Sequence, residues 1–135
     1  MFRVLLVDDY EPFRAVVRSI LRSREHLQAV GESSGGLEAI QKVIELQPDL
    51  VLLDVGLQGL NGIEVGKRLR YLVPRARVLF LTIESSSDVT RKALDLGAIG
   101  YVNKLRTGSE LLAAIEAARA GRRFVGAGFE RVRRE

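Results

Sequence analysis

The chain has 135 residues, of which 47% are hydrophobic and 28% charged, and it contains no cysteine. At this length one globular domain is expected, since a domain takes about 150 residues. The lack of cysteine excludes disulfides and thiolate metal sites, and no stretch approaches the ~18 consecutive apolar residues of a membrane span. Residues 1–4 run directly into an apolar strand pattern, so we expect no export signal and a cytoplasmic protein.

The net charge of +4 belongs to the end of the chain. Residues 119–135 hold six arginines against two glutamates, so residues 1–118 sum to zero. We expect a solvated linker or tail there, because no groove-reading motif accompanies the arginines. A weak electrostatic contact with an acidic partner is the alternative.

Two hydrophobic periods alternate along the chain, one typical of buried strands and one of amphipathic helices. In chain order they predict a strand over 2–7, a helix over 13–21, a strand over 27–32, a helix over 37–44, a strand over 50–55, a helix over 63–72, a strand over 78–82, a helix over 89–96, a strand over 99–102 and a helix over 111–118. Gly97 is expected to close the fourth helix in a left-handed cap.

This alternation predicts an α/β fold with a parallel sheet covered by helices on both faces. Right-handed crossovers leave few possible topologies. The segment 121–135 contains three glycines and much arginine, which is typical of a frayed helix end and a linker. We therefore predict one domain over residues 1–121 and a basic linker or tail over residues 122–135.

Polar residues stand at the carboxyl ends of the predicted strands. The first strand ends in Asp8 and Asp9, the third in Asp54 and the fourth in Thr82, and Lys104 follows the fifth. Ligands of open α/β sheets bind outside the carboxyl ends of the strands. We expect these side chains to converge at one edge of the sheet.

Three carboxylates in one place repel each other and call for a positive charge. Lys104 is one candidate and a divalent cation is the other. Hard oxygen ligands without nearby histidine or cysteine favour Mg²⁺. Taken singly, each residue has a plainer interpretation, such as helix capping for Asp8 and Asp9. Only the joint placement indicates a site.

The chain resembles the receiver domains of two-component response regulators. The resemblance runs from Arg3 to about Arg122 and rests on V-L-L-V-D-D (4–9), P-D-L-V-L-L-D (48–54), G-L-N-G-I-E (59–64), L-F-L-T (79–82) and G-A-I-G-Y-V-N-K (97–104). Residues 110–124 are most similar to the NarL/FixJ-type (LuxR-like) branch. The resemblance implies a flavodoxin-like sheet of five parallel strands in the order 2-1-3-4-5.

The resemblance also implies a role for each residue of the acidic edge. Asp54 would take a phosphoryl group from the phosphohistidine of a sensor histidine kinase or a phosphotransfer protein. Asp9, Asp54 and the backbone carbonyl of Gly56 would bind Mg²⁺ directly, and Asp8 mainly through water. Phosphoryl transfer depends on charge neutralisation and an in-line nucleophile, which suits this set of groups.

Two further residues would carry the switch, and the lysine would stabilise the product. Thr82 would bond a phosphoryl oxygen, Lys104 would pair with the phosphoryl group, and the Tyr101 side chain would move with Thr82. The expected output is transcriptional control, with a possible homodimer, no membrane partner, and DNA contact only through a further output domain.

The sequence departs from the common receiver pattern at three positions. Gln58 and Leu105 stand where many receivers have proline, and Ile83 is bulkier than the usual residue after the threonine. We predict a trans peptide bond between Lys104 and Leu105, because a cis bond before a residue other than proline costs about 2.5–4 kcal/mol. Ile83 is expected at the mouth of the site, where it would slow access.

Two other functions remain open from the sequence. The first is a receiver-like module that binds partners without being phosphorylated. The second is an enzyme, either a nucleotide- or flavin-binding protein or an aspartyl phosphatase. Acidic residues after the first strand would repel phosphate without a metal, dehalogenase-type phosphatases carry D-x-D rather than D-D, and no nucleophile–base pair is visible. We expect no separate substrate, only self-catalysed phosphoryl transfer and slow dephosphorylation.

Overall fold

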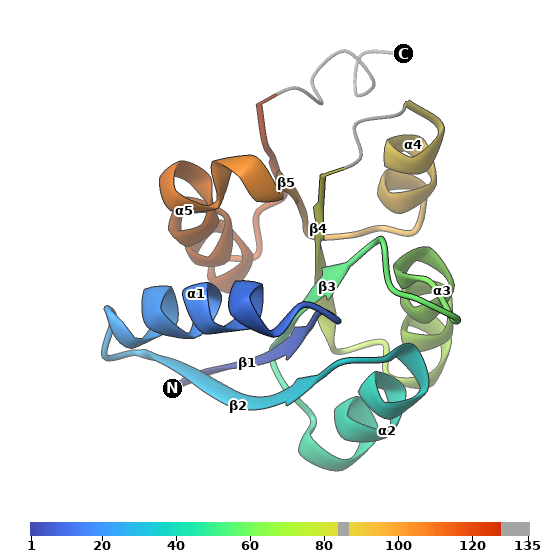
Figure 1. Cartoon of the computed structure of the whole chain (residues 1–135), viewed down its shortest axis with the longest axis horizontal. Coiled ribbons are helices and arrows are strands. Elements are labelled where there is room, and N and C mark those ends of the chain that lie inside the picture. Colours follow the sequence, from blue (N-terminus) through green and yellow to red (C-terminus); the bar gives the residue numbers. More distant parts are fainter. Residues whose placement is uncertain (84–86, 128–135) are drawn as a thin grey trace.

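The computed structural model describes residues 1–83 and 87–127 (Figure 1). Strands and helices alternate as the sequence predicts. The elements are β1 (Phe2–Val7), α1 (Glu11–Arg22), β2 (Leu27–Ser33), α2 (Gly36–Leu46), β3 (Leu50–Asp54), α3 (Gly62–Leu72), β4 (Arg77–Thr82), α4 (Ser87–Asp95), β5 (Gly100–Asn103), the single turn η1 (Lys104–Arg106), α5 (Thr107–Arg119) and β6 (Phe124–Val125).

The strands form one parallel sheet in the order β2-β1-β3-β4-β5-β6. The flavodoxin-like fold and the order of its first five strands are therefore confirmed. The sixth strand was not predicted: Phe124 and Val125 pair with Gly100 and Tyr101 at the edge of β5. The first part of the segment expected to be a linker thus lies against the sheet.

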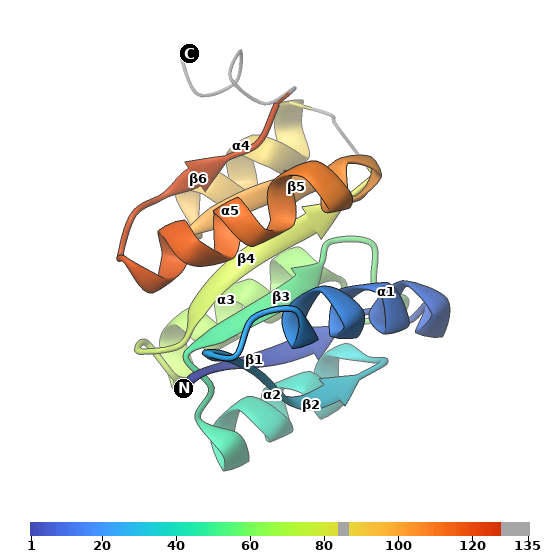
Figure 2. The ribbon, with the colours of Figure 1, turned by 90° about the vertical axis from the view of Figure 1, so that its left-hand side faces the viewer.

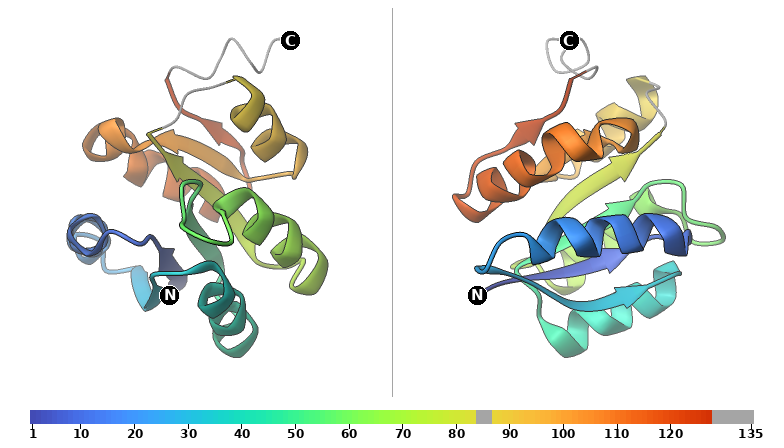
Figure 3. Two further views of the ribbon diagram at one scale, coloured as in Figure 1. Left: turned by 45° about the vertical axis from the view of Figure 1, so that its right-hand side comes forward. Right: turned by 60° about the vertical axis from the view of Figure 1, so that its left-hand side comes forward.

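Helices cover both faces of the sheet. α1 and α5 lie on one face and α2, α3 and α4 on the other (Figures 1 and 3). In Figure 2, which looks onto α1 and α5, the arrowheads of β1, β3 and β4 point the same way. Their carboxyl ends therefore meet at one edge, where α1 and α3 begin.

The core consists of one hydrophobic cluster on each face. Val51 and Leu53 of β3 face the α2–α4 side, whereas Leu50 and Leu52 face the α1–α5 side. All four are at most 1% exposed. Strands covered on both faces bury every residue, which is why they read as continuous apolar runs in the sequence.

Local signals mark the start of α3 and the end of α4. The Asn61 side chain caps α3 by accepting a hydrogen bond from the Glu64 N–H at 3.0 Å. Gly97 has φ of 76° and ends the α4 segment as predicted. No cis peptide bond occurs in the described ranges, so the Lys104–Leu105 bond is trans, also as predicted. Among the described residues, none of the helices combines the length and hydropathy needed to cross a membrane.

Candidate functional site

Three aspartates meet at the carboxyl edge of the sheet. Asp8 and Asp9 follow β1, and Asp54 ends the neighbouring β3. One carboxylate oxygen from each lies within 4.8 Å of the others. Asp8 and Asp54 are buried, at 3% and 5% exposure, whereas Asp9 is exposed. The parallel register brings these residues together although Asp9 and Asp54 are 45 positions apart in the chain.

Lys104 supplies positive charge to this acidic cluster. Its Nζ lies 2.5 Å from Asp8 Oδ2 and 3.3 Å from Asp54 Oδ1. The same ammonium lies 4.7 Å from the centre of the Phe13 ring, a cation–π contact. Three carboxylates against one ammonium leave a formal charge of −2. The donor set of hard oxygens and its charge therefore fit a divalent cation.

The turn that carries Lys104 is held by its neighbours. The Asn103 side chain accepts a hydrogen bond from the Leu105 N–H at 2.8 Å. The Thr107 hydroxyl donates to the Lys104 carbonyl at 2.6 Å. Leu105 itself is 84% exposed, so the side chain at the position of the missing proline points outward. Ile83 is also exposed, at 72%.

Burial is the main influence on the pKa of Asp54. Desolvation raises the pKa of its carboxyl above the ordinary value of 3.8. The Gly56 N–H, which donates to Asp54 Oδ1 at 2.9 Å, and the Lys104 ammonium both lower it, but burial is the larger effect. The charge of Asp8 raises the pKa further. The Asp54 carboxylate is therefore poorly solvated when it is ionised.

In metal-free solution, Asp54→Asn is expected to be more stable than the wild type at neutral pH. A carboxyl whose pKa is raised by folding stabilises the native state below its ordinary pKa of 3.8, and that stability is lost as pH rises through the folded-state pKa. Asparagine avoids the ionisation. Thermal melting in EDTA across pH 4–8 measures this. The gap in Tm should shrink as the pH falls, and a gap independent of pH would contradict the assignment.

Thr82 lies on β4, the strand beside that of Asp54, and Tyr101 lies one strand further, on β5. Thr82 is the last residue of β4, is 2% exposed, and lies opposite Asn103 of β5 in register. Tyr101 is fully buried in β5, with its ring centre 6.1 Å from that of Phe80. The two predicted switch residues thus lie on the two strands that follow β3 in the sheet.

The loop between β3 and α3 folds back onto Asp54. The Gly62 N–H donates to the Val55 carbonyl at 3.0 Å. A Cβ on Gly62 would lie 2.1 Å from the Asp54 backbone oxygen. The sequence motif 59–64 contains this glycine, but the reason for it is a close approach of two backbones.

Two residues near the site carried no sequence signal. Arg14 of α1 donates from Nη1 to the Asp8 backbone carbonyl at 2.5 Å and from Nε to Glu32 Oε1 of β2 at 2.8 Å. Nothing in the spacing of Arg14 and Glu32, 18 residues apart, predicts that contact.

Known proteins are similar to this chain in sequence and in fold. Residues 4–116 match the family model described as response regulator receiver domain. The response regulator GacA of Pseudomonas viridiflava is 34% identical over 125 residues, which cover 93% of this chain and 58% of GacA. The transcriptional regulatory protein LiaR of Bacillus subtilis is 32% identical over 121 residues, covering 90% of this chain and 57% of LiaR.

A solved structure agrees with these relatives. The crystal structure of a two-component response regulator of the LuxR family from Aurantimonas sp. SI85-9A1 has a TM-score of 0.91 and 36% identity, covering 96% of this chain and 92% of that one. The chain spans 57–58% of the length of GacA and LiaR. This chain belongs to the receiver domain family of two-component response regulators, with relatives of the LuxR/NarL type.

Proposed function

We propose that Asp54 is the phosphoacceptor of this receiver domain. The observation that carries the proposal is the placement of the buried Asp54 carboxylate, with Lys104 Nζ 3.3 Å away and the carboxylates of Asp8 and Asp9 alongside. A carboxylate and an incoming phosphoryl group repel each other, so the acceptor needs cations on both sides. Lys104 is one of them.

The second cation is proposed to be Mg²⁺. Asp9, Asp54 and the Gly56 backbone carbonyl would hold it directly, and Asp8 mainly through water. When bound, it would neutralise charge on the phosphoryl oxygens and on the acceptor. The fit rests on three clustered carboxylates and a surplus charge of −2 after Lys104 is counted.

The transfer is an in-line displacement at phosphorus. An Asp54 oxygen forms the new P–O bond as the P–N bond of a phosphohistidine breaks. The imidazole nitrogen keeps the bonding electron pair, and a proton on the other ring nitrogen lets the ring leave neutral. The Lys104 ammonium pairs with the transferred group. Asp54 acts on no separate substrate, and slow hydrolysis of its own acyl phosphate resets it.

Phosphorylation is proposed to reach the output through β4 and β5. The acyl phosphate carries about −2 of charge next to the end of β4, in place of the single negative charge of the Asp54 carboxylate. The Thr82 hydroxyl would donate to a phosphoryl oxygen, and the buried Tyr101 would repack in response. Such a switch needs two packings that differ by a few kcal/mol.

Partners and domain limits complete the proposal. The phosphodonor is a sensor histidine kinase or phosphotransfer protein in the cytoplasm, and the phosphorylated domain pairs with a second copy. Transcriptional output and DNA contact would reside in a further domain, as the greater length of GacA and LiaR suggests. The receiver would comprise residues 1–121, and residues 122–135 would start the linker, whose first part is β6.

Incubation with acetyl phosphate and Mg²⁺ is expected to add one phosphoryl group per chain, because acetyl phosphate can replace a phosphohistidine donor. Intact-mass spectrometry measures the adduct. It should disappear in EDTA and in Asp54→Asn. If the wild type stays unlabelled under conditions that label another receiver, a phosphorylation-independent interaction module becomes the better explanation.

A further inference from the structure

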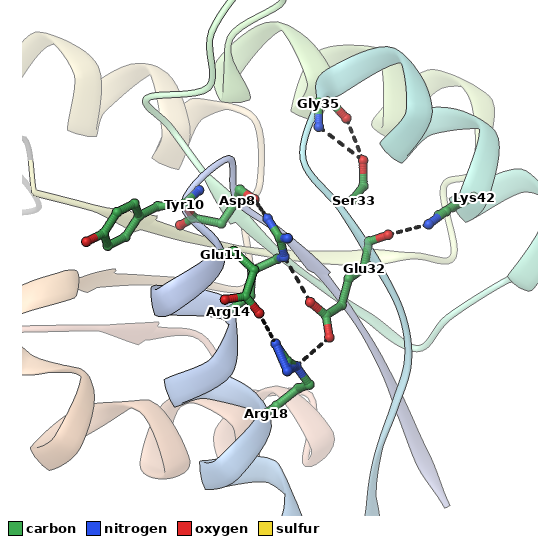
Figure 4. A network of polar contacts seen from close by, with 9 residues as sticks. All are labelled: Asp8, Tyr10, Glu11, Arg14, Arg18, Glu32, Ser33, Gly35 and Lys42. Carbon is green, nitrogen blue, oxygen red and sulfur yellow. Dashed lines mark hydrogen bonds and ion pairs between the residues drawn. The ribbon is translucent and has the colours of Figure 1, made fainter.

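The peptide group between Asp8 and Asp9 is oriented by a side chain outside the acidic cluster. Arg14 of α1 donates to the Asp8 backbone carbonyl through Nη1 at 2.5 Å (Figure 4). A peptide group is planar, so fixing the direction of this carbonyl also fixes the nitrogen of Asp9. Asp9 is exposed, and the direction in which its carboxylate leaves the chain depends on this plane.

Arg14 is itself clamped at its other end. Its Nε donates to Glu32 Oε1 at 2.8 Å, and its side chain is only 15% exposed. The second oxygen of Glu32 lies 2.6 Å from Arg18 Nε, and Arg18 Nη2 lies 2.6 Å from Glu11 Oε1. Lys42 of α2 donates to the Glu32 backbone carbonyl. Figure 4 shows Arg14 spanning from Asp8 to this anchored glutamate.

The other groups of Asp8 have partners of their own. Its N–H donates to the Ser33 carbonyl of β2 at 3.0 Å. Its Oδ1 accepts from the Tyr10 N–H at 2.9 Å, and its Oδ2 pairs with Lys104. Arg14 therefore completes a set of contacts that hold the backbone and side chain of Asp8 from several directions.

We propose that Arg14 is a positioning residue for the cation site, acting through the Asp8–Asp9 peptide and braced by Glu32. This inference rests on the proposed function, because it concerns the Mg²⁺ site of that function. It assigns Arg14 a role through hydrogen bonding rather than through charge.

Charge and positioning predict opposite effects when Arg14 is removed. A guanidinium that bonds the Asp8 carbonyl places a positive charge near the cluster, so by Coulomb's law its loss should strengthen Mg²⁺ binding. Loss of a group that orients a ligand from outside the coordination sphere weakens metal binding, typically 10–100-fold. The sign of the change distinguishes the two roles.

Calorimetric titration of Mg²⁺ into the metal-free proteins tests the inference. Arg14→Met is expected to bind Mg²⁺ about 10-fold or more weakly than the wild type. Glu32→Gln keeps Arg14 but removes its charged anchor and should weaken binding by a smaller factor. Arg18→Met is the matched control: it removes the same charge from α1 and also touches Glu32, but no contact between Arg18 and Asp8 exists in the described structure. Its Mg²⁺ affinity should stay within about twofold of the wild type.

Hydrogen exchange of the Tyr10 amide in metal-free protein gives a second readout. This amide bonds Asp8 Oδ1, so it should exchange faster in Arg14→Met than in Arg18→Met. Unchanged or tighter Mg²⁺ binding by a folded Arg14→Met protein overturns the inference. Mg²⁺ binding by a wild type that is never phosphorylated overturns the proposed function alone. A wild type that binds no Mg²⁺ overturns both.

Discussion

Replacing Lys104 with methionine is expected to lower the free energy of unfolding by about 3–5 kcal/mol in metal-free solution, the usual cost of removing one partner from a buried ion pair. The side chains of Asp8 and Asp54 are only 4% and 7% exposed, and that of Lys104 is 15% exposed. Without the ammonium, two buried carboxylates face each other and Asp9 with no compensating charge. Urea unfolding at neutral pH in EDTA measures the loss.

A double-mutant cycle with Asp8→Asn separates this charge effect from lost packing against Phe13. In the Asp8→Asn background, Lys104→Met should cost clearly less, because one of the two stranded carboxylates has gone. Mg²⁺ should restore part of the stability of Lys104→Met, since a divalent cation replaces the missing charge. An equal cost in both backgrounds would mean that Lys104 stabilises the fold by packing and not by pairing with Asp8.

Gly62→Ala is expected to destabilise the domain by at least about 1–3 kcal/mol, the range for overpacking in a well-packed interior. The added Cβ would lie 2.1 Å from the Asp54 carbonyl oxygen and 2.7 Å from Val55 Cα. Both are backbone atoms, so no side-chain rotation relieves the clash, and β3 and the start of α3 must separate. The phosphoacceptor would then shift, and the rate of phosphorylation by acetyl phosphate should fall together with Tm.

Gly108→Ala is the matched control for this substitution. Gly108 lies in the first turn of α5, and no heavy atom stands within 4 Å of the position that its Cβ would take. Alanine in that position should stabilise the domain by a few tenths of a kcal/mol to about 1 kcal/mol, because it restricts the unfolded chain. In one melting experiment, Gly62→Ala is therefore expected to lower Tm and Gly108→Ala to raise it. A Gly62→Ala protein as stable as Gly108→Ala would show that the close approach to Asp54 is dispensable.

The sequence alone determined the fold class and the membership of the acidic edge. A strand covered on both faces must be apolar throughout. The run from Leu50 to Leu53 is therefore recognisable as a buried strand from the sequence alone. Parallel strands share one carboxyl edge, so residues at strand ends converge whatever their separation in the chain. That geometry is why Asp8, Asp54 and Lys104 could be grouped before their distances were known. Their individual roles came from the resemblance to receivers, not from spacing.

Only the tertiary structure decided two kinds of feature. These are pKa shifts set by competing influences and contacts between residues that are distant in sequence. β6 has only two residues, too few to show a hydrophobic period in the sequence. It forms by pairing with the edge of β5. The pKa of Asp54 is raised because burial outweighs the hydrogen bond from Gly56 and the charge of Lys104. No sequence pattern indicates the outcome of that competition. Arg14 of α1 contacts the backbone carbonyl of Asp8. Every residue has such a carbonyl, so the sequence does not indicate which one an arginine will bind. Hydrophobic periodicity indicates which side of an element is buried. It does not indicate which polar side chains come into contact, because those contacts depend on which elements pack against each other in the folded chain.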